Sequence, residues 1–427
     1  MVRCSSFVRA AVSVSLALPA CGADERASPS PNAAAPSTSA PEGVGSARDA
    51  DVSLAEPDAA AAESDVSAAE PDVAFAEPDI AVAESDVSVV EPDARPAPAP
   101  DAAPTPPAPE PCPPGVECLD ALPASVRGDT RGGPSDIPRY GCAPDVDESG
   151  PERLYRIEVR HEGLLAAALS GLDGETDVDV HLLSARDSGA CLDRGHWRAA
   201  AWVRPGTYFI AVDTWVDADG EPLPGAYTLD VAWTDGAHLA TAGLDPVVAD
   251  RALRVFARAW AREDTDRLEY AIVDFTLESA LPREWIVDLA TGEVLWHLHV
   301  THGEASAAPG DPGRAVSFSN VPESHQSSLG LMRSAETYTG DYGYSFRLDG
   351  LEPGYNDNVR RRDIVMHPWE DARPEAITAA GLPTSWGCPA IDDRLATPVV
   401  DLMAGGALYW FWYPDGDWSR RSTYLND

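Results

Sequence analysis

The stretch Asp177-Val178-Asp179-Val180-His181-Leu182 alternates polar and apolar side chains along the chain. Successive side chains of a β-strand point to opposite faces, so this alternation predicts a strand with one apolar face. Three other short runs, bounded by Gly, Pro and Asp, have the same character: residues 154–159, 208–212 and 227–231. Regularly spaced strands without a convincing helix predict a β-sandwich over residues 112–236.

A different pattern begins after the sandwich. Residues 247–262 place apolar side chains at helical spacing behind Pro246, which predicts an amphipathic helix. Strand signals return at residues 270–275, 285–289 and 293–300, and the turn Thr291-Gly292 predicts a hairpin between the last two. The sequence therefore predicts a mainly β fold, in which the sandwich precedes a β-rich domain with a leading helix over residues 240–427.

The N-terminal segment 22–111 consists mostly of Ala, Pro, Ser and acidic residues, and glutamate recurs every seven residues from Glu56 to Glu91. A seven-residue period is typical of coiled coils, but the prolines that follow these glutamates argue against a helix. We therefore expect a disordered acidic tether. The formal net charge of the whole chain, −39, argues against nucleic-acid binding, which needs a basic face.

Residues 1–21 carry Arg3 and Arg9, then an apolar run, then Leu18-Pro19-Ala20-Cys21. This pattern resembles a bacterial lipoprotein signal, and the resemblance implies that Cys21 is lipidated. An ordinary cleaved signal with an incidental cysteine is the alternative. Gly22 in place of an aspartate favours the outer membrane, so we expect an exported lipoprotein of the cell envelope that faces the periplasm and reaches the membrane through its acyl chains.

The cysteines suit an oxidising compartment. Four of them lie in or before the sandwich and allow three pairings, of which proximity favours Cys112 with Cys118 and Cys142 with Cys191. Cys388 remains unpaired, and it is either a small buried hydrophobe or a reactive thiol.

Two short stretches carry the residues for nucleophilic catalysis: Ile364-Val365-Met366-His367 and Ser385-Trp386-Gly387-Cys388-Pro389. A thiolate attacks carbonyl carbon, and an imidazole generates the thiolate and later protonates a leaving amine. A glycine before the nucleophile lets backbone N–H groups face a developing oxyanion. Sequence spacing alone does not bring Cys388 and His367 into contact.

Several short stretches between residues 268 and 412 match the motifs of a known family, in the same order along the chain. They include Val300-Thr301-His302-Gly303, Ser327-Ser328-Leu329-Gly330, Glu336-Thr337-Tyr338-Thr339-Gly340, Asn356-Asp357 and Ser385-Trp386-Gly387-Cys388-Pro389-Ala390. This part resembles the L,D-transpeptidase (YkuD-type) murein catalytic domain. Residues 176–183 and 205–212 resemble the bacterial pre-peptidase C-terminal type of β-sandwich, which accompanies secreted hydrolases.

The transpeptidase resemblance implies roles for named residues. Cys388 would be the nucleophile and His367 its general base and later acid, while Gly387 and Cys388 would lend N–H groups to the oxyanion hole. Ser385 matches the family's hydroxyl residue, and four further residues would line the cleft: Tyr344, Arg347, Asn356 and Trp386. Arg347 would meet a peptide carboxylate. A purely structural role is the alternative for each of these four.

The chain departs from the family pattern at two places. Pro368-Trp369 follows the histidine, where the family has glycine; proline keeps the carbonyl that orients the imidazole, so orientation survives while the loop stiffens. Pro389-Ala390-Ile391 offers no Arg or Asn after the cysteine, so recognition of the acyl donor must come from elsewhere.

We expect no metal and no cofactor in this chemistry. His297 and His299 share a strand face and suit zinc, but a half-exposed strand is the favoured interpretation. A solvated acidic hairpin is likewise favoured over a calcium loop for Asp213, Asp217, Asp219 and Glu221.

The expected partners are peptidoglycan stem peptides, and the expected activity is L,D cross-linking through a Cys388 thioester. Hydrolysis of the same thioester, giving an L,D-carboxypeptidase, is one alternative. A catalytically inactive wall-binding lipoprotein is the other, and the Pro368 departure is its main support.

Overall fold

The computed structural model describes residues 111–426. The expected signal segment with Cys21 and nearly all of the expected tether lie outside the described residues. None of the helices between residues 111 and 426 combines the length and the apolar character that crossing a bilayer requires. The fold is mainly β, as the strand patterns predict.

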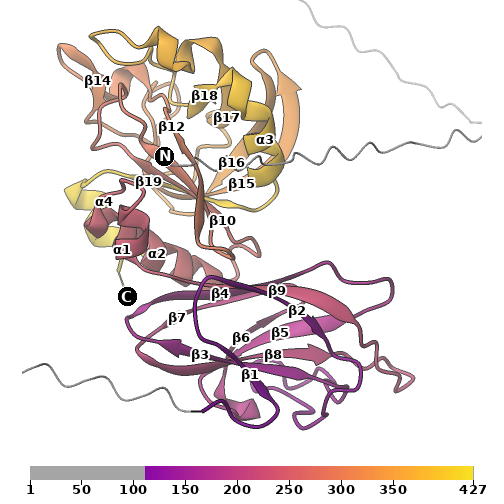
Figure 1. Cartoon of the computed structure of the whole chain (residues 1–427). Coiled ribbons are helices and arrows are strands. Elements are labelled where there is room, and N and C mark those ends of the chain that lie inside the picture. The colour runs from indigo at the N-terminus through magenta and orange to yellow at the C-terminus, as the bar shows by residue number, and fades with distance from the viewer. Residues whose placement is uncertain (1–110, 427) are drawn as a thin grey trace, which may run out of the picture. The chain divides into compact units, whose positions relative to one another are not determined.

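Residues 116–234 form a β-sandwich of two sheets (Figure 1). One sheet has five strands in the order β1 (Val116–Leu119), β3 (Arg153–Val159), β8 (Gly206–Thr214), β5 (Val178–Leu183), β6 (Cys191–Gly195). The other has four strands in the order β2 (Ala124–Asp129), β9 (Ala226–Thr234), β4 (Gly163–Ser170), β7 (Arg198–Val203). Apolar side chains of both inner faces, such as Val180, Leu165 and Val231, pack into one core, which confirms the predicted sandwich.

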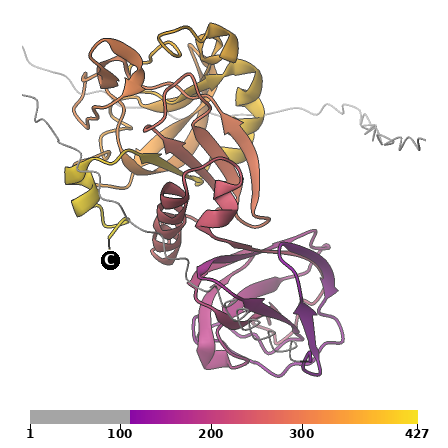
Figure 2. The same ribbon diagram turned by 60° about the vertical axis from the view of Figure 1, so that its left-hand side comes forward.

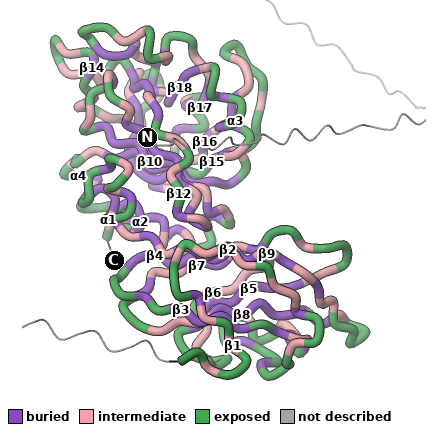
Figure 3. Tube along the Cα trace, in the orientation of Figure 1, coloured by how far each residue is buried: buried purple, intermediate pink, exposed green. Residues whose placement is uncertain are grey.

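Strand β5 differs from the prediction of one apolar and one solvated face. All six of its residues are buried, including the polar Asp179 and His181 (Figure 3). The segment between β2 and β3 covers this second face, where the ring of Tyr140 stacks on that of His181 at 3.7 Å between centroids. Ile137 from the same segment joins a small apolar cluster beside it.

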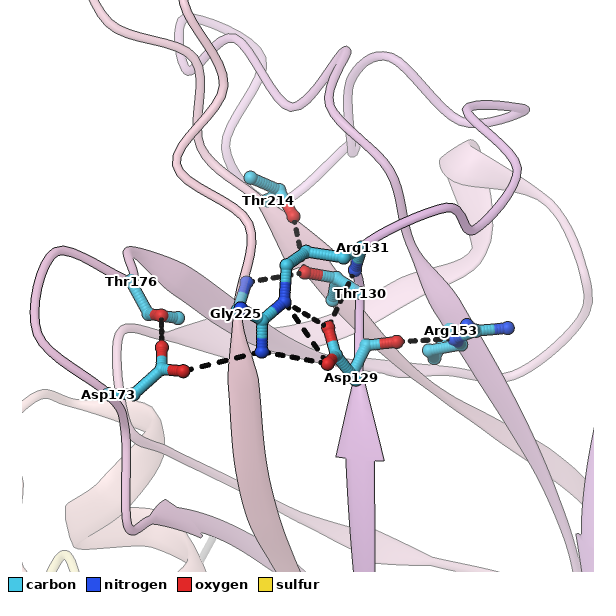
Figure 4. A network of polar contacts seen from close by, with 8 residues as sticks. All are labelled: Asp129, Thr130, Arg131, Arg153, Asp173, Thr176, Thr214 and Gly225. Atoms are coloured by element: carbon cyan, nitrogen blue, oxygen red, sulfur yellow. Dashed lines mark hydrogen bonds and ion pairs between the residues drawn. The ribbon is translucent and has the colours of Figure 1, made fainter.

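Side-chain contacts tie the loops at one end of the sandwich together (Figure 4). The buried hydroxyl of Thr130 accepts hydrogen bonds from the Gly225 N–H at 3.1 Å and from the Thr214 hydroxyl at 3.0 Å. The Arg131 guanidinium bridges the carboxylates of Asp129 and Asp173, at 2.8 and 3.3 Å. Disulfides join Cys112 to Cys118 and Cys142 to Cys191, which are the two pairs that proximity favours.

The C-terminal domain is built on an eight-stranded sheet. Its order is β12 (Glu293–Leu298), β11 (Glu284–Asp288), β10 (Glu269–Asp274), β19 (Leu408–Trp412), β15 (Gly330–Gly340), β16 (Gly343–Gly350), β17 (Val365–Trp369), β18 (Ala390–Asp392). A small separate sheet pairs β13 (Ala307–Ala308) with β14 (Asp311–Ala315). The predicted hairpin is the pair β11 and β12, and the buried rings of Trp410 and Phe411 on β19 lie in the core.

Four α-helices accompany these sheets: α1 (Gly236–Ala240), α2 (Pro246–Ala261), α3 (Asp393–Met403) and α4 (Gly416–Arg421). The short 3₁₀ helices span Ser188–Ala190, Glu304–Ser306, Glu370–Ala372 and Pro374–Ala376. Helix α2 begins where the Asp245 carboxylate accepts the N–H groups of Val247 and Val248, with Pro246 in the first turn. The apolar side chains of α2 are buried in the domain core, which confirms the predicted leading helix. Figure 2 shows the ribbon from a second side.

Parallel pairing of β17 with β18 positions His367 and Cys388, two of the expected site residues. His367 on β17 lies opposite Ala390 on β18, and Cys388 precedes Ala390 by two residues. The pairing therefore places His367 and Cys388 at the same end of the sheet.

Candidate active site

The loop that carries Cys388 is held by hydrogen bonds to its own backbone. The Ser385 hydroxyl donates to the Cys388 carbonyl at 2.7 Å and accepts the Gly387 N–H at 3.1 Å. Thr301 also donates to the Cys388 carbonyl, at 3.0 Å, and accepts the Ala390 N–H. Ser385 and Thr301 thus fix the position of the Cys388 carbonyl, and Cys388 itself lines the cleft.

Gly387 has a backbone conformation that only glycine adopts readily, with φ +119°. A Cβ atom at this position would lie 2.7 Å from the Gln326 carbonyl oxygen and 2.8 Å from Ile364 Cδ1. The Ser327 hydroxyl donates to the Gly387 carbonyl at 3.1 Å. The position therefore needs glycine both for its φ angle and for the close approach of neighbouring atoms.

The expected oxyanion hole needs a correction. The Gly387 N–H donates to Ser385 Oγ, so it is not available to a substrate oxyanion in this conformation. Among the described residues, the Cys388 N–H has no hydrogen-bond acceptor. The Cys388 N–H is therefore the donor that this loop offers to an oxyanion.

His367 lies on β17 and lines the same cleft as Cys388, and its ring is buried. Its Nδ1 lies 2.9 Å from the carbonyl oxygen of Pro368. A carbonyl only accepts, so Nδ1 carries the proton and Nε2 carries the lone pair. Pro368 therefore supplies the orienting carbonyl that the family pattern takes from glycine, and the chemistry of a general base is preserved.

Both groups are electrically neutral near pH 7. Burial raises the pKa of Cys388 to about 11, although the nearby Arg362 guanidinium opposes this shift. Burial also lowers the pKa of His367 below its usual value, against the effect of its bond to Pro368. The thiol donates weakly to the Asp363 carbonyl at 3.5 Å. The cleft therefore holds a neutral thiol and a neutral imidazole.

This charge state predicts how Cys388 reacts with iodoacetamide. Because the thiolate is the reactive form and its pKa lies near 11, the alkylation rate should rise about tenfold per pH unit from pH 7 to pH 10. Mass spectrometry of wild type, with Cys388→Ala as background, measures this rate. A rate that levels off below pH 8 would instead reveal a preformed thiolate–imidazolium pair.

Cys388 and His367 line the same cleft, which encloses about 720 Å³. Other lining residues include Tyr338, Tyr342, Arg347, Arg362, Asp363, Trp369, Ser385 and Trp386. The expected contribution of Ser385, Trp386 and Arg347 to the cleft wall thus agrees with their positions. The Arg347 guanidinium already pairs with Asp363 at 3.1 Å and lies over the Tyr338 ring, so a substrate carboxylate would have to compete with Asp363.

Trp386 is 69% exposed, which is unusual for so large an apolar ring. It stacks on the His325 ring at 4.6 Å with an interplanar angle of 7°, and His325 is held by Glu304 at 2.7 Å. The indole is thus held by a stacking partner while one face stays accessible to solvent.

The structure does not bring Asn356 and Tyr344 to the cleft, contrary to the expectation from the family. Asn356 is fully buried, and its amide bonds the carbonyls of Leu329 and Leu331 and the N–H of Glu352. The Tyr344 hydroxyl donates to Asp401 at 3.0 Å. These side chains have structural roles, because their polar atoms already have protein partners.

Arg362 and Tyr342 are cleft residues that the sequence did not single out. Arg362 donates to the hydroxyls of Ser328 and Ser324, at 2.7 and 3.1 Å, which fixes its charge near the thiol. The Tyr342 ring lies 4.4 Å from that of His367 and comes from the turn between β15 and β16. The hairpin turn Gly340-Asp341-Tyr342-Gly343, with one large exposed ring, is the signal that would have indicated Tyr342.

The histidines near β12 do not converge on a common point. His297 bonds the Pro282 carbonyl at 3.0 Å and His299 the Ala280 carbonyl at 3.2 Å. Alternate burial along β12 fits the favoured interpretation of a half-exposed strand. In the acidic hairpin, Asp217 accepts the N–H groups of Asp219 and Glu221, while Asp213 is buried and bonds Tyr140.

The fold and the cleft define a mainly β protein with a cysteine and a histidine at one end of a mixed sheet. Residues 240–412 match the family model of the L,D-transpeptidase catalytic domain. No curated protein matches the chain.

Two solved structures show weak likenesses. The pre-peptidase C-terminal domain of a Bacillus anthracis collagenase is 16% identical, over 29% of this chain and 99% of its own, with a TM-score of 0.19. PliG from Aeromonas hydrophila, a periplasmic inhibitor of g-type lysozyme, is 12% identical, over 27% of this chain and 96% of its own, with a TM-score of 0.18.

Proposed function

We propose that the protein is a cysteine-dependent L,D-transpeptidase that cross-links peptidoglycan stem peptides. One observation carries this proposal: Cys388 and His367 line one cleft, and the bond of His367 Nδ1 to the Pro368 carbonyl leaves Nε2 as the base. The family match over residues 240–412 supports the choice of peptidoglycan as substrate.

The reaction follows from these groups. His367 Nε2 takes the thiol proton as Cys388 Sγ attacks the carbonyl between diaminopimelate and the terminal D-Ala. The amide C–N bond breaks, His367 returns the proton to the leaving D-Ala amine, and a thioester remains. An amine of a second stem peptide then attacks the thioester, forms the cross-link and returns a proton to sulfur through His367. The Cys388 N–H would stabilise the oxyanion in both steps.

Water in place of the acceptor amine would give an L,D-carboxypeptidase. We favour the transfer reaction because the family that residues 240–412 match is named for L,D-transpeptidases. The inactive wall-binding alternative loses its main support, since Pro368 provides the carbonyl that the imidazole needs.

We further propose that the chain is an exported lipoprotein, anchored through Cys21 in the outer membrane and facing the periplasm. The lipoprotein-like signal in residues 1–21 supports this location. An acidic tether after Cys21 would let the folded part work at a distance from the membrane.

Incubation of full-length protein in detergent with intact murein sacculi tests the activity. Muramidase digestion and mass spectrometry should reveal new stem-peptide dimers linked between two diaminopimelate residues, together with free D-Ala. Free D-Ala with trimmed monomers alone would identify the hydrolase. Unchanged muropeptides, with no D-Ala released, would contradict both catalytic proposals.

A further inference from the structure

A cluster of metal-ligating side chains lies in the sandwich, away from the Cys388 cleft. Glu148, Asp179 and His181 are each fully buried, and one ligand atom from each lies within 4.8 Å of the others. Asp179 and His181 are adjacent on the same face of β5, and Glu148 comes from the segment that covers that face. The Tyr140 ring stacks on His181 and closes the site from one side.

Polar atoms in this cluster lack hydrogen-bond partners. Both carboxylate oxygens of Glu148 and both ring nitrogens of His181 are buried without one among the described residues. His181 Nε2 and Glu148 Oε1 approach to 3.5 Å. Burying polar groups without hydrogen bonds costs free energy, so a native protein ordinarily provides a partner for them. The ligand atoms lie within 4.8 Å of one another, so a single bound ion could reach all of them.

The buried carboxylates of this cluster also favour binding of a cation. Glu148 and Asp179 are both buried, and the neighbouring guanidinium belongs to Arg194. Arg194 Nη2 contacts Asp179 Oδ2 and lies 3.6 Å from Glu148 Oε1. One guanidinium is therefore shared by two buried carboxylates, which leaves the cluster able to accept a further positive charge.

A second group of ligand atoms shares Asp179. His196 Nδ1 lies 2.7 Å from Asp179 Oδ1, and the Asp177 carboxylate joins the same group within 4.8 Å. The His196 side chain is 62% exposed, so this side of the cluster opens toward solvent. An ion could reach the buried ligands from this exposed side.

We propose that this cluster binds a divalent transition-metal ion of the zinc class, with Asp179 as its central ligand. Glu148 and His181 would bind from inside, and His196 or Asp177 would complete the coordination from the solvent side. Two ligand atoms of a tetrahedral zinc site lie about 3.4 Å apart, which matches the approach of His181 to Glu148. Imidazole ligands favour zinc over calcium, which takes oxygen ligands.

Arg194 is compatible with this site. It contacts Asp179 through Oδ2, while Oδ1 faces His196, so the carboxylate can bridge the guanidinium and the ion. The metal would join β5 to the segment between β2 and β3, and its role is structural, since the site shares no residue with the Cys388 cleft.

Metal titration of full-length protein without an affinity tag tests the proposal. After dialysis against chelator, wild type should take up one Zn²⁺ per chain, measured by mass spectrometry of the metal. Added Zn²⁺ should also raise Tm, because it binds only the folded state. Co²⁺ should give the intense visible absorption of a tetrahedral site.

Variants identify the ligands. Asp179→Asn and His181→Gln should weaken zinc binding by more than about 100-fold, and the exposed His196→Gln by about tenfold or more. The double variant His297→Gln/His299→Gln, at the C-terminal end of β12 and just after it, is the matched control and should bind as wild type does. Absence of stoichiometric uptake by wild type overturns the proposal even if the buried variants fail to fold, as does loss of binding in the control alone.

Discussion

Replacing Cys388 by alanine should lower the rate of D-Ala release and of cross-link formation by at least about 10³-fold, since no nucleophile remains for the thioester. The loss should appear in kcat, because the rest of the cleft still binds substrate. Thioester adducts of 1:1 stoichiometry, visible by mass spectrometry of intact wild-type protein, should be absent from the variant. Cys388 is the one free cysteine among residues 111–426, so another described thiol does not replace it.

A control for Cys388→Ala is a variant with an equally small change far from the cleft. Ser184→Ala removes an exposed hydroxyl from the sandwich and should leave both rates unchanged. Equal melting temperatures for the two variants would show that folding is intact. Cross-linking by Cys388→Ala at the wild-type rate would exclude the covalent mechanism and, with it, the assigned role of His367.

Replacing Gly387 by alanine should destabilise the protein by about 2–4 kcal/mol and reduce activity by about 100-fold or more. Two effects add at this position. The φ angle of +119° strains any residue with a Cβ atom, and that atom would meet the Gln326 carbonyl at 2.7 Å and Ile364 at 2.8 Å. Relief of the clash would move the Cys388 thiol relative to His367, so stability and rate should fall together.

Gly354 provides the matched control for this substitution. Its φ is also positive, at +84°, but a Cβ atom there would meet nothing within 4 Å. Gly354→Ala should therefore cost about 1 kcal/mol from backbone strain and leave the rate unchanged. Urea unfolding and the D-Ala assay measure both quantities. If the two variants lost equal stability and equal activity, close packing around Gly387 would not be the cause.

Much of the fold could be predicted from local pattern. Helix α2 follows from Pro246 and the apolar stripe behind it, and the strands β3, β5, β8 and β9 follow from alternation. Strands β4 and β19 were missed because their apolar residues run continuously, without a period. Such runs are typical of strands buried on both faces, and periodicity alone does not separate them from buried helices.

In the candidate site, too, residues with partners nearby in the sequence could be predicted and residues with distant partners could not. Gly387, Cys388 and the Pro368 carbonyl could be anticipated because each acts on residues beside it in the chain. Asn356 and Tyr344 were placed wrongly, because their partners lie far away in the sequence. Arg362 was overlooked for the same reason, since its charge matters only through its position near Cys388.

The sequence by itself determined the mainly β fold and the leading helix, and it singled out Cys388 and His367, on which the proposed chemistry rests. Side-chain periodicity and turn residues depend only on neighbours in the chain, so helices and strands can be predicted from the sequence. Only the tertiary structure decided that β17 and β18 pair in parallel and bring those two residues into one cleft. It alone decided that the polar face of β5 is buried, because the segment between β2 and β3 covers Asp179 and His181.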